Sequence, residues 1–118
     1  MELKMTQNRN KLIDLFIGNI ANAAVHKILE QAIEDKILRK YYDKELLNSM
    51  EIAKRYREKI NPINKALPEK DIEYIKSKII NKVNSELKLR IEKGYKNINL
   101  DLAEGVVNKL LVDMKVKD

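Results

Sequence analysis

The sequence predicts an all-α fold, a small single-domain bundle of about four helices. The 118-residue chain has only three Gly and two Pro, too few for the many turns of an all-β domain. Its apolar residues recur at spacings of three and four residues, which is the period of an amphipathic helix. The length fits one hydrophobic core, so residues 1–118 are interpreted as a single helical domain.

The first predicted helix runs from about residue 7 to residue 42. Its apolar residues share one face as far as Ala24, and from Val25 onward they share a different face. Either the helix breaks near Gly18 to Asn22, or one long helix packs against different partners on different sides. The long helix is favoured, because the segment is rich in Ala and a single interior Gly costs only about 1 kcal/mol.

The second helix is predicted at residues 44–60, with Asp43 as its N-terminal cap and an inward face of Leu46, Met50, Ala53 and Ile60. It is expected to end before Pro62, because the residue that precedes a proline is disfavoured in a helix. Both prolines fall in the following connector, near residues 61–68.

The third helix is predicted at residues 69–93 and the fourth at residues 100–115. Pro68 suits the first turn of the third helix, and Gly94 can supply a left-handed C-terminal cap. Asn99 or Asp101 can start the fourth helix, and Asp101 and Glu104 stand at capping-box spacing there, with Asp in place of Ser or Thr. The expected core faces are Ile72, Ile75, Ile79, Val83 and Leu87 in the third helix, and Ala103, Val107, Leu110 and Met114 in the fourth.

The composition excludes several classes of site. With no Cys and one His, the chain lacks a disulfide framework, a thiolate nucleophile and a Cys-based zinc site, so neither a metal nor a cofactor is expected. The polar N-terminal stretch has no secretory signal, and a cytoplasmic location is expected. The stretch from Leu12 to Leu29 is not expected to be transmembrane, because Asp14, Lys27 and several other polar residues would have to enter hydrocarbon.

The positive charge is concentrated in the middle of the chain. The formal net charge is +6, and residues 36–59 carry eight basic side chains against four acidic ones. Lys and Arg interleaved with Tyr can neutralise phosphates while the rings stack on unpaired bases. A nucleic-acid site is therefore one hypothesis for this region, against the alternative of a solvated helix face; its candidate residues are Lys36, Arg39, Lys40, Tyr41, Lys54, Arg55, Tyr56 and Arg57.

A polar stripe on the first helix contains the single histidine. Asn19, Asn22, His26 and Glu30 share one side, where His26 could act as a general base or the stripe could bind a small ligand. The alternative is the solvent side of an amphipathic helix or a contact between subunits. An enzyme would need other polar side chains brought beside His26 by folding, and the chain has no catalytic motif or phosphate-binding Gly loop.

The favoured interpretation is a noncatalytic helical domain that self-associates, most simply as a homodimer, through the first helix. The rotating apolar face of that helix offers more surface than three short helices can obviously cover. The candidate interface residues are Phe16, Ile17, Ile20, Ala24 and Ile28. The alternative function is nucleic-acid binding through residues 36–59, and the two functions are not exclusive.

Overall fold

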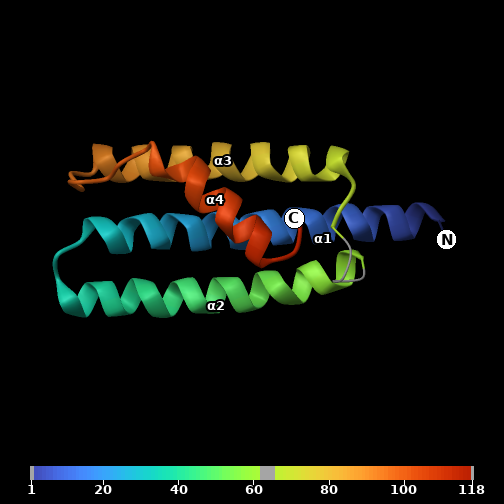
Figure 1. The fold of residues 1–118 in the computed structure, drawn as a ribbon, viewed down its shortest axis with the longest axis horizontal. Coiled ribbons are helices and arrows are strands. Elements are labelled where there is room, and N and C mark those ends of the chain that lie inside the picture. Colours follow the sequence, from blue (N-terminus) through green and yellow to red (C-terminus); the bar gives the residue numbers. More distant parts are fainter. Residues whose placement is uncertain (1, 62–65, 118) are drawn as a thin grey trace.

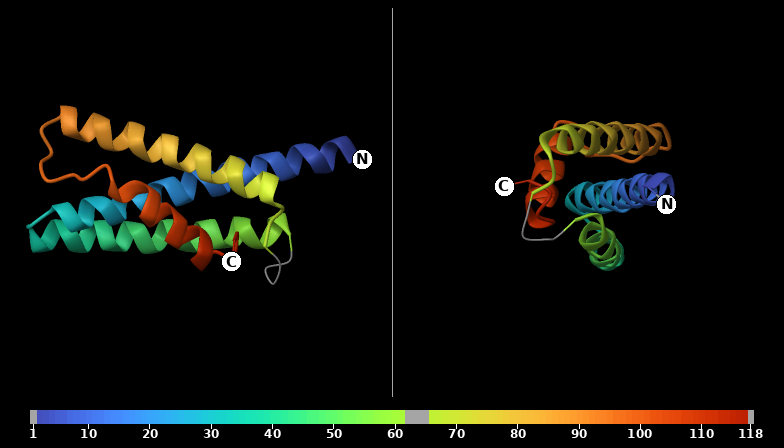
Figure 2. Two further views of the ribbon diagram at one scale, coloured as in Figure 1. Left: turned by 45° about the horizontal axis from the view of Figure 1, so that its top comes forward. Right: turned by 90° about the vertical axis from the view of Figure 1, so that its right-hand side faces the viewer.

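The computed structural model describes residues 2–61 and 66–117, with side chains described from Arg9 onward, and it shows the predicted all-α fold. The helices are α1 (Glu2–Ala32), α2 (Lys36–Ile60), α3 (Glu69–Glu92) and α4 (Leu102–Asp113). α1, α2 and α3 lie side by side, and α4 crosses one face of this layer (Figure 1, Figure 2). The bundle is elongated, with principal extents of 49 × 25 × 23 Å.

The first helix ends at Ala32, and the predicted continuation to residue 42 is wrong. The chain turns at residues 33–35, and α2 begins at Lys36 with Asp35 as its N-cap. The Asp35 carboxylate accepts hydrogen bonds from backbone N–H groups of Ile37 at 2.9 Å and Leu38 at 3.2 Å, which would otherwise lack partners. Asp43, the predicted cap, lies inside α2. The turn was missed because it contains neither Gly nor Pro.

α1 is the central helix, and it contacts α2, α3 and α4. It is continuous through Gly18 to Asn22, which confirms the prediction of an unbroken helix there. The apolar face rotates because different parts of its circumference pack against different helices. Residues 9–32 are long and apolar enough to span a membrane by length and composition, and more than half of the most apolar stretch is buried inside the bundle. Packing against three helices accounts for this apolar composition.

The core faces predicted for the other helices are confirmed. The buried residues among them are Leu46, Ala53, Ile60, Ile75, Ile79, Val83, Leu87, Ala103, Val107, Leu110 and Met114, while Met50 and Ile72 are partly buried against the same core. The helical period alone therefore predicts which side of each of these helices faces inward.

The C-terminal end of α3 follows the prediction. Gly94 adopts a left-handed φ of 99°. The N–H groups of Gly94 and Tyr95 donate to the carbonyl oxygens of Ile91 and Arg90, each at 3.0 Å. These two bonds form a Schellman motif, which satisfies carbonyls that have no partner within the helix.

The capping box predicted for α4 is wrong. Asp101 is the N-cap, but its side chain makes no capping hydrogen bond. Instead, the side-chain oxygen of Asn99 accepts a bond from the Asp101 N–H at 3.0 Å.

Residues 62–65 of the predicted connector lie outside the described residues. Just after them, the N–H of buried Leu67 donates to the carbonyl oxygen of Val116 at 3.1 Å. The start of α3 is thereby tied to the segment that follows α4.

Candidate functional site

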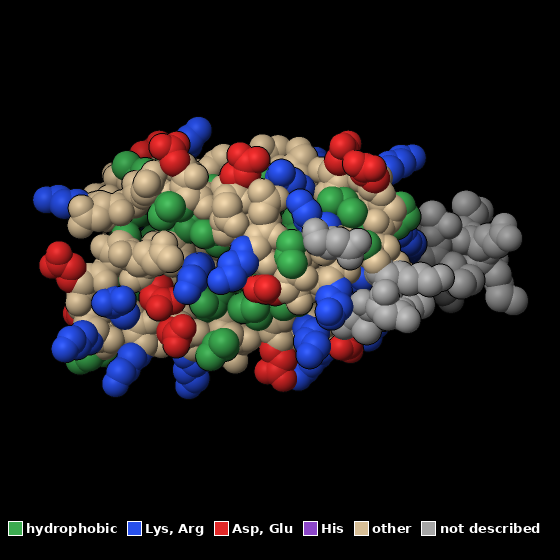
Figure 3. Space-filling model, in the orientation of Figure 1, with side chains coloured by type: hydrophobic (Ala, Val, Ile, Leu, Met, Phe, Trp, Pro, Cys, Tyr) green, Lys and Arg blue, Asp and Glu red, His purple; other side chains and the backbone are tan. Residues whose placement is uncertain are grey.

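An apolar groove lies between α2 and α4. α4 packs against α1 and α3, whereas the Cα atoms of α2 and α4, both fully described, stay more than 8 Å apart. Leu46 and Met50 form one wall of the groove, and Leu102, Val106 and Leu110 form the other, around a volume of about 460 Å³. Figure 3 shows hydrophobic side chains exposed between these two helices. Leu102 is exposed and Met50 and Val106 are half-buried, whereas Leu46 and Leu110 are buried, so the α2–α4 groove leaves part of its apolar lining uncovered.

Four charged side chains surround the α2–α4 groove: Lys27, Asp101, Lys109 and Asp113. None of them belongs to the ion pairs found among the described residues, which are Arg9–Asp71, Arg55–Glu51 and Lys76–Glu104. Two charges of each sign leave the rim without net charge. Lys27 is half-buried and the other three are exposed. Charges at such a rim add little binding energy, but they select a partner whose charges are complementary.

The sequence pattern does not predict this groove. Leu46, Met50 and Leu110 belong to the predicted inward faces, and Leu46 and Leu110 are buried as predicted. The spacing of Leu102, Val106 and Leu110 by four residues places an apolar stripe along one flank of α4, and this pattern was visible in the sequence. Only the distance between α2 and α4 shows that the stripe borders an open groove.

The five residues predicted to form an interface on the first helix lie in the core of a single chain. Phe16, Ile17, Ile20, Ala24 and Ile28 are each at most 2% exposed. They are covered by the other helices of the same chain, so a second copy could reach them only if the bundle opened. Any surface that pairs two intact bundles must therefore be a different one.

The eight candidate nucleic-acid residues divide into two groups at opposite ends of α2. Lys36, Arg39, Lys40 and Tyr41 are exposed near its start, and Lys54 and Arg55 are exposed near its end. Lys54 follows Lys40 by fourteen positions, which places these groups about 21 Å apart along the helix. Tyr56 is half-buried against the core. The groups do not form one continuous patch, and Asp43, Glu51 and Glu58 interrupt the basic side chains.

Arg57 does not belong to that surface, because it is fully buried. Its guanidinium donates to the carbonyl oxygen of Lys115 at 2.7 Å, to that of Asn61 at 3.3 Å and to the side-chain oxygen of Asn61. Burial lowers the pKa of Arg57. The prediction that Arg57 contacts phosphate is therefore wrong. Arg57 links the end of α2 to the C-terminal segment.

The polar stripe of α1 is satisfied in part within its own helix. The Asn19 side chain donates to the carbonyl oxygen of Leu15 at 2.8 Å. Asn22 is exposed, while His26 and Glu30 are half-buried. Glu30 Oε2 is a buried atom without a hydrogen-bond partner among the described residues.

Folding does bring polar side chains beside His26. Its ring lies 5.5 Å from that of Tyr42, whose phenol is a hydrogen-bond partner of the Tyr95 phenol. The Arg90 guanidinium lies 5.5 Å from the centre of the Tyr95 ring. Burial lowers the pKa of His26 below its ordinary value; nearby Glu45 opposes this effect and Arg90 adds to it. These contacts fasten the start of α2 and the loop after α3 to α1.

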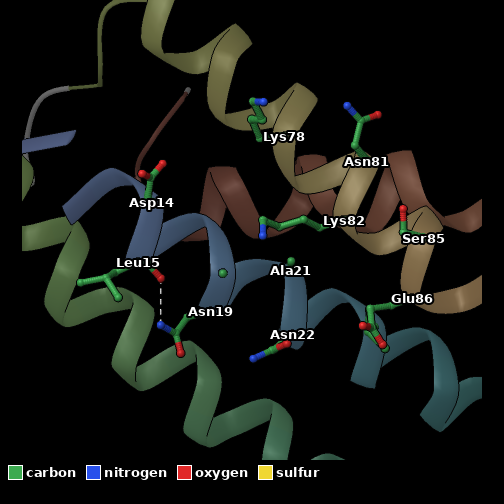
Figure 4. A pocket seen from close by; sticks show the side chains of 12 residues that line it. Asp14, Leu15, Asn19, Ala21, Asn22, Lys78, Asn81, Lys82, Ser85 and Glu86 are labelled. Atoms are coloured by element: carbon green, nitrogen blue, oxygen red, sulfur yellow. Dashed lines mark hydrogen bonds between the residues drawn. The ribbon is translucent and has the colours of Figure 1, made fainter. Parts of the chain in front are cut away.

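A second groove, between α1 and α3, is lined by both polar and apolar residues. Lys78, Lys82 and Ser85 of α3 face Asp14 and Gly18 of α1 around a volume of about 660 Å³. Figure 4 shows the Lys82 side chain extending from α3 toward α1. The groove combines acidic, basic and amide side chains with the apolar side chains of Leu15, Ala21 and Val25, so its chemistry does not define a single class of ligand.

No group of three or more His, Asp and Glu side chains within residues 9–61 and 66–117 could hold a metal ion. Comparison with known proteins finds no matching family model, no similar curated protein and no similar solved structure. A functional interpretation therefore depends on the surfaces described above.

Proposed function

We propose that this chain is a noncatalytic protein-interaction domain that pairs with a second copy of itself through the α2–α4 groove. The observation that supports this proposal is the partly exposed apolar lining between two helices whose Cα atoms stay more than 8 Å apart. Burying apolar surface of this kind stabilises an association by roughly 25 cal/mol per Å² before the costs of ordering are subtracted.

The charges around the groove favour a second copy over an unrelated partner. A two-fold dimer brings the same surface of both chains together, so the surface must be complementary to itself. Asp101 and Asp113 are matched in number by Lys27 and Lys109, and a two-fold arrangement can place acids opposite bases. The flank of α4 from one chain would enter the groove of the other, and neighbouring parts of α2 would extend the contact toward the roughly 800 Å² per partner of a stable interface.

Gel filtration with light scattering on matched variants of α4 tests the proposal. Leu102 and Val112 are 38% and 44% exposed on the same helix, but only Leu102 lines the groove. We expect a wild-type dimer, and we expect Leu102→Glu to weaken dimerisation about tenfold or more by placing a charge in the apolar contact. Val112→Glu is the control and should dimerise like the wild type. A strictly monomeric wild type at high micromolar concentration, or equal effects of the two substitutions, would contradict the proposal.

A second candidate function is nucleic-acid binding through α2, favoured by the exposure of five of its predicted basic contacts: Lys36, Arg39, Lys40, Lys54 and Arg55. Fluorescence anisotropy with single-stranded and duplex oligonucleotides over a salt series tests it. Each phosphate contact contributes about −0.7 to −0.9 to the slope of log affinity against log salt, so the double variant Lys54→Ala, Arg55→Ala should make the slope shallower by roughly 1.5. Absence of binding at low salt would exclude this function.

A further inference from the structure

The first two turns of α2 form an unusual surface at one end of the bundle. Ile37 is 82% exposed, the highest value among the large hydrophobic residues that the structure describes, and Leu38 and Tyr41 are 39% and 56% exposed. Their spacings of three and four residues to Tyr41 place these side chains on one side of the helix. We call residues 36–44, with these three apolar side chains, the α2 corner. Exposure of these apolar side chains to water does not stabilise the fold, because each of them would have a lower free energy if it were buried.

Basic side chains surround the same apolar group. The α2 corner contains Lys36, Arg39, Lys40 and Lys44 against one acidic residue, Asp43, and Glu34 and Glu45 lie just outside it. Glu45 lies near His26. Asp35, just before the corner, uses its carboxylate to cap α2. Figure 3 shows several Lys and Arg side chains projecting at the end of the bundle where α1 turns into α2. The corner therefore combines exposed apolar side chains with four basic side chains.

The corner is held in place by contacts to the rest of the bundle. The Tyr41 ring packs edge-on against that of Tyr42 at 5.6 Å, and Tyr42 is buried against His26 at 5.5 Å. The cap at Asp35 orders the first turn. The apolar side chains are thus presented from an ordered helix end, and inserting them into a partner requires little ordering of the backbone.

We propose that the α2 corner binds the surface of an anionic lipid membrane. At such a surface Ile37 and Leu38 leave water for the boundary of the acyl chains, Tyr41 lies at headgroup level, and the Lys and Arg side chains approach the lipid phosphates. A nucleic acid could engage the basic residues and Tyr41, but it would leave Ile37 and Leu38 in water. The aliphatic exposure is what favours a lipid surface over a polynucleotide.

This inference is independent of the proposed dimer. Neither Ile37 nor Leu38 lines the α2–α4 groove, which begins at Leu46 on this helix. A variant of the corner should therefore keep the oligomeric state of the wild type, and loss of one function can be measured without loss of the other.

Co-sedimentation with vesicles tests the proposal. The full chain should sediment with vesicles of equimolar phosphatidylcholine and phosphatidylglycerol, and it should stay in the supernatant with phosphatidylcholine alone. The double variant Ile37→Ser, Leu38→Ser should lower the partition coefficient about tenfold or more, because it removes two apolar side chains from the contact. The double variant Lys36→Ala, Lys40→Ala should lower it about tenfold or more, since each basic residue near an anionic surface contributes about 1 kcal/mol.

Matched controls on the same helix separate this effect from nonspecific hydrophobic or electrostatic binding. Leu47 is 61% exposed, and Lys54 and Arg55 are exposed basic residues, but all three lie outside the corner. Leu47→Ser and the double variant Lys54→Ala, Arg55→Ala should bind like the wild type, and circular dichroism should show that every variant is folded. The proposal is overturned if the wild type stays in solution with anionic vesicles or if the controls lose as much binding as the corner variants. It is also overturned if the lysine variant loses oligonucleotide binding while the Ile37, Leu38 variant keeps both oligonucleotide and vesicle binding.

Discussion

Arg55 and Arg57 lie two positions apart on α2, but their replacement should change the free energy of unfolding by very different amounts. Arg57 is fully buried, and it donates hydrogen bonds to the carbonyl oxygens of Lys115 and Asn61. Arg57→Ala would leave these acceptors without the guanidinium and would open a cavity. An unsatisfied buried polar group costs about 1–3 kcal/mol, so the free energy of unfolding should fall by about 3–5 kcal/mol.

Arg55 is the matched control. Its side chain is 69% exposed and pairs with Glu51 at 3.4 Å, an exposed pair whose loss should cost less than about 0.5 kcal/mol. Urea and thermal denaturation followed by circular dichroism should give a Tm lower by about 10–20 °C for Arg57→Ala and nearly unchanged for Arg55→Ala. Arg57→Met should fall between them, because it keeps the apolar stem but donates no hydrogen bond. Equal Tm values for the two alanine variants would refute the assignment of Arg57 to the core.

Three further predictions concern the helix start, the histidine and the dimer. Asp35→Ala should lower the free energy of unfolding by about 1 kcal/mol through loss of the α2 cap, while Asp43→Ala should change it little; chemical denaturation compares them. Because folding lowers the pKa of His26, the folded state favours the neutral ring, and the free energy of unfolding should decrease as the pH falls below 6.5, the ordinary pKa of His. Urea denaturation between pH 7.5 and 5 should show this dependence on pH, and His26→Gln should remove it. Met50→Glu, on the α2 wall of the groove, should weaken dimerisation as Leu102→Glu does, and light scattering that shows an intact dimer would exclude this groove as the contact.

The helices and their inward faces followed from the sequence because they depend on local spacing. The set Ile75, Ile79, Val83 and Leu87 repeats every four residues, and every member is fully buried. Gly94 was identified as the end of α3 because a left-handed residue is least strained when it has no side chain. The turn between α1 and α2 was missed because Asp35 resembles any helical acid until its carboxylate is seen to accept two backbone bonds.

The surfaces could not be predicted in the same way, because they depend on the distances between elements. Arg55 and Arg57 have similar sequence surroundings, yet one is solvated and the other is buried, since only the position of the C-terminal segment decides which one is covered. Phe16 and Ile28 are apolar enough for an interface between subunits. The turn at residues 33–35 folds α2 back onto α1, however, and α2 together with the other helices buries both side chains. The composition and periodicity determined that this chain forms an all-α bundle. The tertiary structure alone decided that α4 packs against α1 and α3 while its Cα atoms stay more than 8 Å from those of α2, which leaves the apolar groove between α2 and α4.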